Sequence, residues 1–98
     1  MVWIVVKNHT EYREENKYKV TLECNIKKPK YTKKINYTLY RKYGSKWVEE
    51  DSSGKRSNKV TTYEIEKNTT VQYKIKATLY DDDGNTINAT KVYKVKVK

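Results

Sequence analysis

Cysteine, histidine, proline, glycine and phenylalanine are scarce or absent in this chain. Its 98 residues include one cysteine, one histidine, one proline and three glycines, and no phenylalanine. The lone Cys24 excludes an intramolecular disulfide, so the fold must be stable without a covalent cross-link. His9 is the only histidine, and one histidine with one cysteine do not supply the ligand set of a zinc site. We therefore expect neither a disulfide nor a bound zinc ion.

The same scarcity argues against catalysis. Three glycines do not supply a glycine-rich loop that would cradle a phosphate group. Cys24 lies in an alternating stretch that points it toward the core, where a cysteine packs as a small hydrophobic residue and lacks the positioned base that a nucleophile needs. We predict a protein that is not an enzyme and that needs no cofactor.

No long apolar run opens the chain. The segment Met1 to Val6 ends at Lys7, far short of the about 20 residues that cross a bilayer and shorter than the apolar region of a signal peptide. We interpret this segment as the first strand of the fold, with any export signal already removed. The protein is predicted not to be transmembrane.

The residues that are abundant favour an all-β domain. Valine, isoleucine, threonine and tyrosine dominate, with ten tyrosines in the chain, and these types suit a pleated, half-buried surface. A chain with 36% hydrophobic residues and this many aromatic rings does not have the composition of a disordered protein. Its length suits one core, so residues 1–98 are expected to form a single domain.

Alternation of apolar and polar residues predicts the strands. The clearest case is Lys17 to Ile26, where every second residue from Tyr18 onward is apolar or cysteine. Further strands are expected around residues 35–40, 47–48, 60–65, 71–80 and 89–97. A polar loop is predicted at 51–58 and a turn at Asp83-Gly84. Seven such segments without a helical period predict a seven-stranded antiparallel Greek-key β-sandwich of the immunoglobulin-like class.

Two stretches resemble the fibronectin type III family of immunoglobulin-like domains. Residues 35–51 read INYTLYRKYGSKWVEED and look like the tyrosine-rich strand, turn and short tryptophan-bearing strand of that family. Residues 62–85 read TYEIEKNTTVQYKIKATLYDDDGN and resemble its later strands up to the last turn. The resemblance covers about residues 18 to 97 and implies a fibronectin type III-like sandwich whose last two strands pair. It implies no ligand, since one fold serves many functions.

The charge is strongly one-sided. Lysine and arginine number 22 against 12 acidic residues, which gives a formal net charge of +10. Such a field attracts polyanions, and nucleic acid, anionic lipid, acidic glycans and anionic cell-wall polymers all satisfy it. The sequence gives no reason to expect sequence-specific binding of nucleic acid.

Two groups of lysines are candidates for an anion-binding site. If the last two strands pair, one sheet face carries Lys74, Lys76, Lys94 and Lys96, with Tyr80 and Tyr40 alongside. Like charges on neighbouring strands repel, and a polyanion would relieve that repulsion. The alternative is that these lysines only solubilise the face and block edge pairing. The second group lies around Pro29 and Tyr31 and consists of Lys27, Lys28, Lys30, Lys33 and Lys34; its alternative is a solvated connection.

Two further patterns have simple alternatives. Asn8, Asn36, Asn68 and Asn88 each begin an Asn-X-Ser/Thr sequence, which marks glycosylation in a secreted eukaryotic protein but also arises by chance in an Asn- and Thr-rich chain. The run Asp81 to Asp83 has the charge for calcium. It lacks the alternate spacing and closing glutamate of an EF-hand, so we interpret it as a turn.

The sequence therefore predicts a non-catalytic binding or structural module, secreted or displayed on a cell surface. Its lysine-rich face is expected to contact an anionic polymer or a protein at a cell surface. Two alternatives stay open. One is a small cationic antimicrobial or bacteriocin-like effector, and the other is a purely architectural or designed domain without a ligand.

Overall fold

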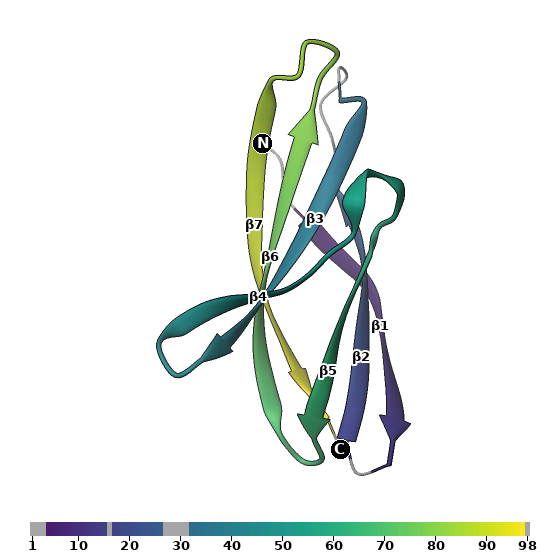
Figure 1. Cartoon of the computed structure of the whole chain (residues 1–98), viewed down its shortest axis with the longest axis vertical. Helices are drawn as coiled ribbons and strands as arrows, with labels where there is room; N and C mark the ends of the chain where they lie inside the picture. Colours follow the sequence, from purple (N-terminus) through teal and green to yellow (C-terminus); the bar gives the residue numbers. More distant parts are fainter. Residues whose placement is uncertain (1–3, 16, 27–31, 98) are drawn as a thin grey trace.

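The structure is a computed structural model that describes residues 4–15, 17–26 and 32–97 (Figure 1). Seven strands and one short 3-10 turn follow each other along the chain. They are β1 Ile4–Glu14, β2 Lys17–Ile26, β3 Lys34–Tyr43, β4 Lys46–Ser52, η1 Gly54–Arg56, β5 Lys59–Glu66, β6 Thr70–Tyr80 and β7 Thr86–Lys96. The all-β prediction is confirmed. Within the described ranges, no helix is long and apolar enough to cross a membrane.

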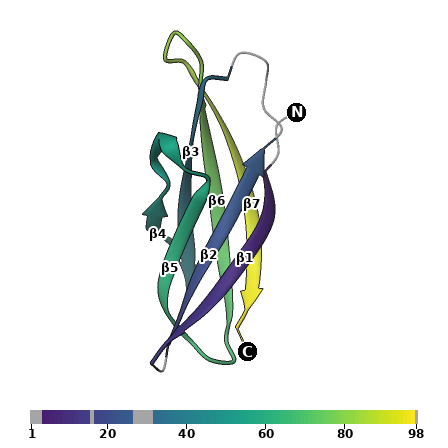
Figure 2. The same ribbon diagram turned by 90° about the vertical axis from the view of Figure 1, so that its right-hand side faces the viewer.

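The strands form two sheets that face each other. The three-stranded sheet has the order β1-β2-β5 and the four-stranded sheet the order β4-β3-β6-β7, and all neighbours are antiparallel. Figure 2 looks onto the three-stranded sheet with strands of the other sheet behind it. The predicted seven-stranded antiparallel sandwich is confirmed at this level.

The first strand differs from its prediction. It was expected to span Met1 to Val6, of which residues 1–3 lie outside the described residues. From Ile4, β1 continues past Lys7 to Glu14 and pairs with β2, with a bulge between Val6 and Asn8. Beyond the bulge its inward positions carry polar side chains, namely His9, Glu11 and Arg13. This part of β1 lies at the open edge of the sheet, where polar side chains reach water, so it lacks the apolar alternation that would reveal a strand.

The core lies between the two sheets, and β6 shows how the sequence specifies it. Along β6 every second residue from Val71 to Leu79 is buried, as the period of a strand requires. The three-stranded sheet contributes Ile4, Val20, Leu22, Cys24, Ile26, Val60 and Ile65. The four-stranded sheet and the residue after it contribute Tyr37, Leu39, Val71, Tyr73, Ile75, Ala77, Leu79, Ala89, Val95 and Val97. Because successive side chains of a strand point to opposite sides, the residues between these buried positions point away from the core.

Two polar groups are buried within this core. The Tyr73 and Thr62 side chains come from opposite sheets and are 0% and 1% exposed. Burial raises the pKa of the Tyr73 phenol, and the nearby Thr62 hydroxyl opposes part of that rise. Neither hydroxyl oxygen has a hydrogen-bond partner among the described residues. Tyr73 and Thr62 are therefore polar groups of the core whose hydrogen-bonding capacity is left unsatisfied.

The fourth strand leaves part of β3 uncovered. β4 pairs with β3 only from Thr38 to Tyr43, and the hairpin that they form projects from the body of the sandwich (Figure 1). At Tyr37 the chain is held by Ser53, whose Oγ accepts from the Tyr37 N–H at 2.9 Å and whose N–H donates to the Tyr37 carbonyl at 2.8 Å. The chain then crosses through η1 to β5. The first residues of β3 are therefore a free edge of the sheet.

Candidate functional site

The outer face of the β6-β7 pair carries the four lysines expected there. In the register each lies opposite an uncharged residue rather than opposite another lysine. The pairs are Lys74 with Val92, Lys76 with Thr90, Lys94 with Gln72, and Lys96 with Thr70. The lysines are therefore staggered. Staggering avoids the direct cross-strand repulsion between like charges that would be most destabilising.

Two aromatic rings and a fifth lysine extend this surface onto β3 and β4. Tyr40 lies opposite Lys74 in the register, and Trp47 lies opposite Lys42. The Lys74 Nζ is 4.8 Å from the centre of the Trp47 ring and 6.0 Å from that of Tyr40. The Lys42 Nζ is 5.8 Å from the Trp47 ring centre. The ammonium groups thus sit over ring faces, where the ring quadrupole attracts them.

We call this surface the basic face. It consists of Tyr40, Lys42, Trp47, Lys74, Lys76, Lys94 and Lys96. Tyr40 was expected beside the lysines, but Lys42 and Trp47 were missed. Lys42 and Trp47 face each other across the two-residue turn at Gly44 and Ser45, on the turn side of the bulge between Leu39 and Tyr40, so a hairpin register read from that turn would have predicted the pair. Tyr80, the other expected ring, lies at the far end of β6, where the Lys55 Nζ is 4.2 Å from its ring centre.

The positive charge of the basic face is not neutralised. In the part of the chain that the structure describes there are two ion pairs, His9 with Glu11 and Lys33 with Asp82, and neither belongs to this face. The register places one carboxylate of β4 here, Glu49, opposite Tyr40. Unpaired charges on one side of a protein add to a field that raises the local concentration of anions.

The outer face of the three-stranded sheet has a different pattern, and we call it the balanced face. Its register sets lysines against glutamates: Lys17 lies opposite Glu66, and Lys59 lies opposite Glu23. Lys19 lies opposite Tyr12, with its Nζ 5.5 Å from the ring centre. Opposite charges at facing positions stabilise a sheet, so the charges of this face offset each other by their positions in the register, although no ion pair forms on it among the described residues.

The second group of predicted lysines is only partly described. Lys27, Lys28 and Lys30 lie outside the described residues. Lys33 and Lys34 stand at the start of β3, where the Lys33 N–H donates to the Tyr80 carbonyl at 2.8 Å. Lys34 lies opposite Tyr80, whereas Lys76, the nearest lysine of the basic face along β6, lies opposite Thr38. Four residues of strand, about 13 Å, separate these two positions, so Lys34 shares the outer side of the sheet but is not adjacent to the basic face.

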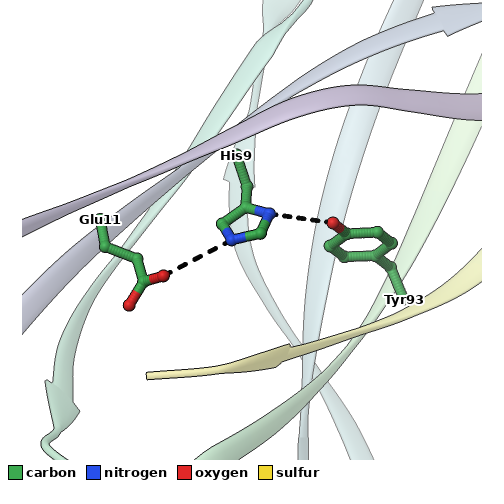
Figure 3. Close-up of polar contacts among 3 residues, drawn as sticks. All are labelled: His9, Glu11 and Tyr93. Carbon is green, nitrogen blue, oxygen red and sulfur yellow. Dashed lines mark hydrogen bonds and ion pairs between the residues drawn. The ribbon is translucent and has the colours of Figure 1, made fainter. Parts of the chain in front are cut away.

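The only histidine takes part in a polar contact between the two sheets (Figure 3). The His9 Nδ1 is 3.0 Å from the Tyr93 hydroxyl, and its Nε2 is 3.5 Å from the Glu11 carboxylate. The two rings meet edge to face at 6.1 Å. Because β1 and β7 are edge strands of different sheets, this contact ties the sheets together along one side of the sandwich.

The only cysteine is enclosed by the core. Cys24 is 0% exposed, and burial, with a smaller effect from Glu23, raises the pKa of its thiol to about 11. A thiol that stays protonated at neutral pH is a poor nucleophile and a poor metal ligand. Among the described residues no group of three or more histidine, cysteine or acidic side chains could hold a metal ion.

The acidic run after β6 forms a turn that is held by hydrogen bonds to the side chain and the carbonyl of Asp81. The Asp81 Oδ1 accepts the N–H groups of Asp83 and Asn85, both at 2.9 Å, and the Gly84 N–H donates to the Asp81 carbonyl at 3.3 Å. Gly84 has a positive φ of 82°, which a residue without Cβ adopts at low cost. The Asp81 carboxylate is thus engaged in hydrogen bonds within the turn. This agrees with the turn that was predicted here.

The four asparagines of the Asn-X-Ser/Thr sequences differ in access. Asn8, Asn68 and Asn88 are exposed, whereas Asn36 is half-buried within β3. The Asn36 Oδ1 accepts from the Ser52 hydroxyl at 2.9 Å. Asn36 is therefore engaged by the neighbouring strand. The other three side chains are accessible, although the Asn88 Oδ1 accepts from the Thr78 hydroxyl of β6 at 3.0 Å.

Comparison with known proteins identifies no relative of this chain. No protein-family model matches it, and no curated protein and no solved structure matches it. The function is therefore inferred from the residues of the chain itself, of which the basic face is the most distinctive group.

Proposed function

We propose that the protein is a non-catalytic binding module that holds an extended anionic polymer against the basic face. The observation that carries the proposal is the segregation of charge between two sheets of one small domain. Lysines on the balanced face are set against glutamates, whereas those on the basic face are set against aromatic or uncharged residues. A role in solubility alone does not require that separation.

The proposed fold family is the fibronectin type III type of immunoglobulin-like Greek-key sandwich. Support comes from the two hairpins that the sequence resemblance implies, β3 with β4 and β6 with β7. Further support is that β4 joins β3. In constant-type immunoglobulin domains the fourth strand instead joins the sheet of the first, second and fifth strands.

The proposed mechanism uses charge for attraction and the rings for contact. Lysines two residues apart on a strand are separated by about 7 Å along it, so β6 and β7 each present a repeating row of ammonium groups. Repeated sulfate, carboxylate or phosphate groups of a polymer can neutralise such rows. Trp47 and Tyr40 offer flat surfaces against which a sugar ring or a base packs. The proposed setting is outside the cell or on its surface, where acidic polymers are accessible.

The experiment is a titration with a heparin oligosaccharide at several salt concentrations, with single-stranded DNA of matched length as the second polymer. If four lysines each meet one anionic group, log Kd should rise with log salt with a slope of about 3 for a flexible strand. The affinity would then fall by roughly 50-fold between about 50 and 200 mM salt. A Kd that does not change with salt would contradict the electrostatic mechanism.

Two matched double variants separate the basic face from net charge. K74Q/K76Q removes two lysines from the central strand β6, and K17Q/K19Q removes two from the central strand β2. We expect the first to weaken binding by about tenfold or more and to lower the salt slope by about 1.4. The second should change the Kd by less than about twofold. Equal losses would mean that only net charge matters, and no binding by the parent would favour a purely architectural domain.

A further inference from the structure

A second group of lysines surrounds a hollow at the end of the sandwich where β6 finishes. The hollow has a volume of about 550 Å³. Four lysines line it, namely Lys33, Lys34, Lys55 and Lys59, and no described acidic residue does. Lysines drawn from separate segments of the chain thus converge on one space without a carboxylate among them.

The path of the backbone explains this convergence. Lys33 and Lys34 stand at the start of β3, on the stretch that β4 leaves uncovered. Lys55 belongs to η1, which crosses from one sheet to the other, and Lys59 begins β5. The β5 side is held in place where the Cys24 N–H donates to the Asn58 carbonyl at 2.8 Å. The hollow is therefore formed by the crossing itself.

The four ammonium groups have little compensation. The Lys33 Nζ is 3.9 Å from the Asp82 carboxylate, but the two side chains are 60% and 75% exposed, and exposed pairs of this kind contribute little. The Lys55 Nζ lies over the Tyr80 ring. Lys34 forms no ion pair with any described residue, and Lys59 faces Glu23 in the register without forming an ion pair with it. An anion in the hollow would neutralise charges that the fold leaves unpaired.

Two neutral side chains of the wall, Asn25 and Ser57, have hydrogens free to donate, whereas the Asn58 amide already donates to the Cys24 carbonyl at 3.0 Å. The Asn25 Oδ1 already accepts the Ile26 N–H at 2.9 Å, which leaves its amide NH₂ to donate. The Ser57 Oγ accepts the Lys59 N–H at 3.1 Å, which leaves its hydroxyl hydrogen to donate. Ammonium, amide and hydroxyl donors around one space match a group with several acceptor oxygens.

We propose that this hollow binds a single tetrahedral oxyanion, the phosphate or sulfate group of a small molecule or of a chain end. Such a group carries up to two negative charges and offers oxygens in several directions, so several converging lysines and the neutral donors can contact it together. A carboxylate, with two oxygens in one plane, satisfies fewer of them. The site lies at the other end of β6 from Lys96, and its occupation does not depend on the basic face.

Inorganic phosphate and inorganic sulfate are suitable probes, each titrated into ¹⁵N-labelled protein with sodium chloride adjusted to keep the ionic strength constant. We expect saturable shifts of the backbone amides around Lys33, Lys34 and residues 55–59, with acetate producing much weaker ones. A tighter Kd for phosphate would point to a phosphate ester as the natural source, and a tighter Kd for sulfate to a sulfate ester. Shifts that do not saturate with either ion would overturn the proposal.

Variants connect the binding to the hollow. K55Q/K59Q should weaken phosphate binding by about tenfold or more, and K55R/K59R, which keeps both charges, should bind within about threefold of the parent. K17Q/K19Q, on the balanced face, should leave the phosphate Kd within about twofold. Because all of these side chains are exposed or half-buried, the fold should persist, and a circular dichroism spectrum checks it. Equal weakening by K55Q/K59Q and K17Q/K19Q would show that phosphate responds only to net charge and would refute the site.

Discussion

The outer faces of the two sheets use lysine in opposite ways. On the balanced face, Lys17 and Lys59 lie opposite glutamates, so the charges stabilise the sheet to which they belong. On the basic face, Lys74 and Lys94 lie opposite a valine and a glutamine, and the Lys74 ammonium lies over the rings of Tyr40 and Trp47. The comparison teaches that net charge is a poor guide to function, because the same residue type is internally compensated on one face and available to a partner on the other.

The largest expected effect comes from reversing charge on one face at a time. K74E/K76E and K17E/K19E change the net charge by the same amount. We expect the first to weaken binding of a heparin oligosaccharide by about 100-fold or more at low salt, because each new carboxylate repels the polymer that the lysine attracted. K17E/K19E should cost less than about fivefold. Isothermal titration calorimetry measures both, and similar losses would erase the distinction between the faces.

The aromatic part of the basic face is tested by Trp47→Ala. Stacking against an aromatic side chain contributes about 1 to 3 kcal/mol per contact, so we expect a loss of about tenfold in affinity for the polymer. The salt slope should stay the same because no lysine is removed. Tyr12→Ala is the matched change on the balanced face, where the ring also lies under a lysine, and it should leave the affinity unchanged. A lower slope for Trp47→Ala would mean that the ring acts only by holding Lys74.

Alternation alone explains which parts of this fold were predictable. In β2 and β6 every inward position is apolar or cysteine, half-buried at Tyr18 and buried at the others, so the pattern specifies strand, face and core together. β1 was cut short because its inward positions after Val6 are polar. Those positions lie at the sheet edge, where burial does not select apolar residues.

The lysine part of the basic face was predictable from the spacing within each strand together with the pairing of the last two strands that the family resemblance implies. Lys74 and Lys76 share a face by spacing, and the same holds for Lys94 and Lys96. Trp47 joins them through the regular register of the β3-β4 hairpin, where it lies opposite Lys42 across the two-residue turn Gly44-Ser45, a local signal that our prediction did not use. The hollow was missed for a different reason, since Lys55 and Lys59 approach Lys33 only through the crossing between sheets.

The inner faces of the two sheets should differ in their response to alkaline pH. In the three-stranded sheet, burial raises the pKa of Cys24 from 9.0 to about 11. In the four-stranded sheet, burial and then Cys24 raise the pKa of Tyr37 from 10.0 to about 12. Each group loses its proton first in the unfolded chain, so the unfolded state binds fewer protons and stability falls as pH rises, beginning near pH 9 with Cys24.

Cys24→Ala isolates the thiol in that comparison. Between about pH 8 and 10 the parent should lose about 1 kcal/mol more stability than the variant, since one unit of pKa shift corresponds to about 1.4 kcal/mol. Urea unfolding at each pH measures the difference. The variant will be less stable than the parent at every pH because it leaves a cavity, so the slope and not the offset is the readout. Parallel slopes would show that the thiol is not the group that titrates first.

The smallest expected effect is the response of stability to salt without any ligand. Repulsion among the staggered lysines of the basic face should be screened as salt rises from about 20 to 300 mM, which should stabilise the parent by a few tenths of a kcal/mol. K74Q/K76Q should flatten this dependence. K17Q/K19Q removes a lysine that faces Glu66 and leaves the lysines of the basic face in place. The rise of stability with salt should therefore be as steep as in the parent or steeper. Thermal unfolding at matched salt concentrations gives the three curves.

The most direct test of the central claim is a map of the polymer on the protein. In a titration of ¹⁵N-labelled protein with a short heparin oligosaccharide, we expect saturating shifts of the Trp47 indole N–H and of the backbone amides around Lys74, Lys76 and Lys94. Amides of outward residues on β2, such as Lys17 and Lys19, should stay in place. Shifts as large on β2 as on β6, or a Trp47 indole that does not respond, would contradict the assignment of binding to the four-stranded sheet.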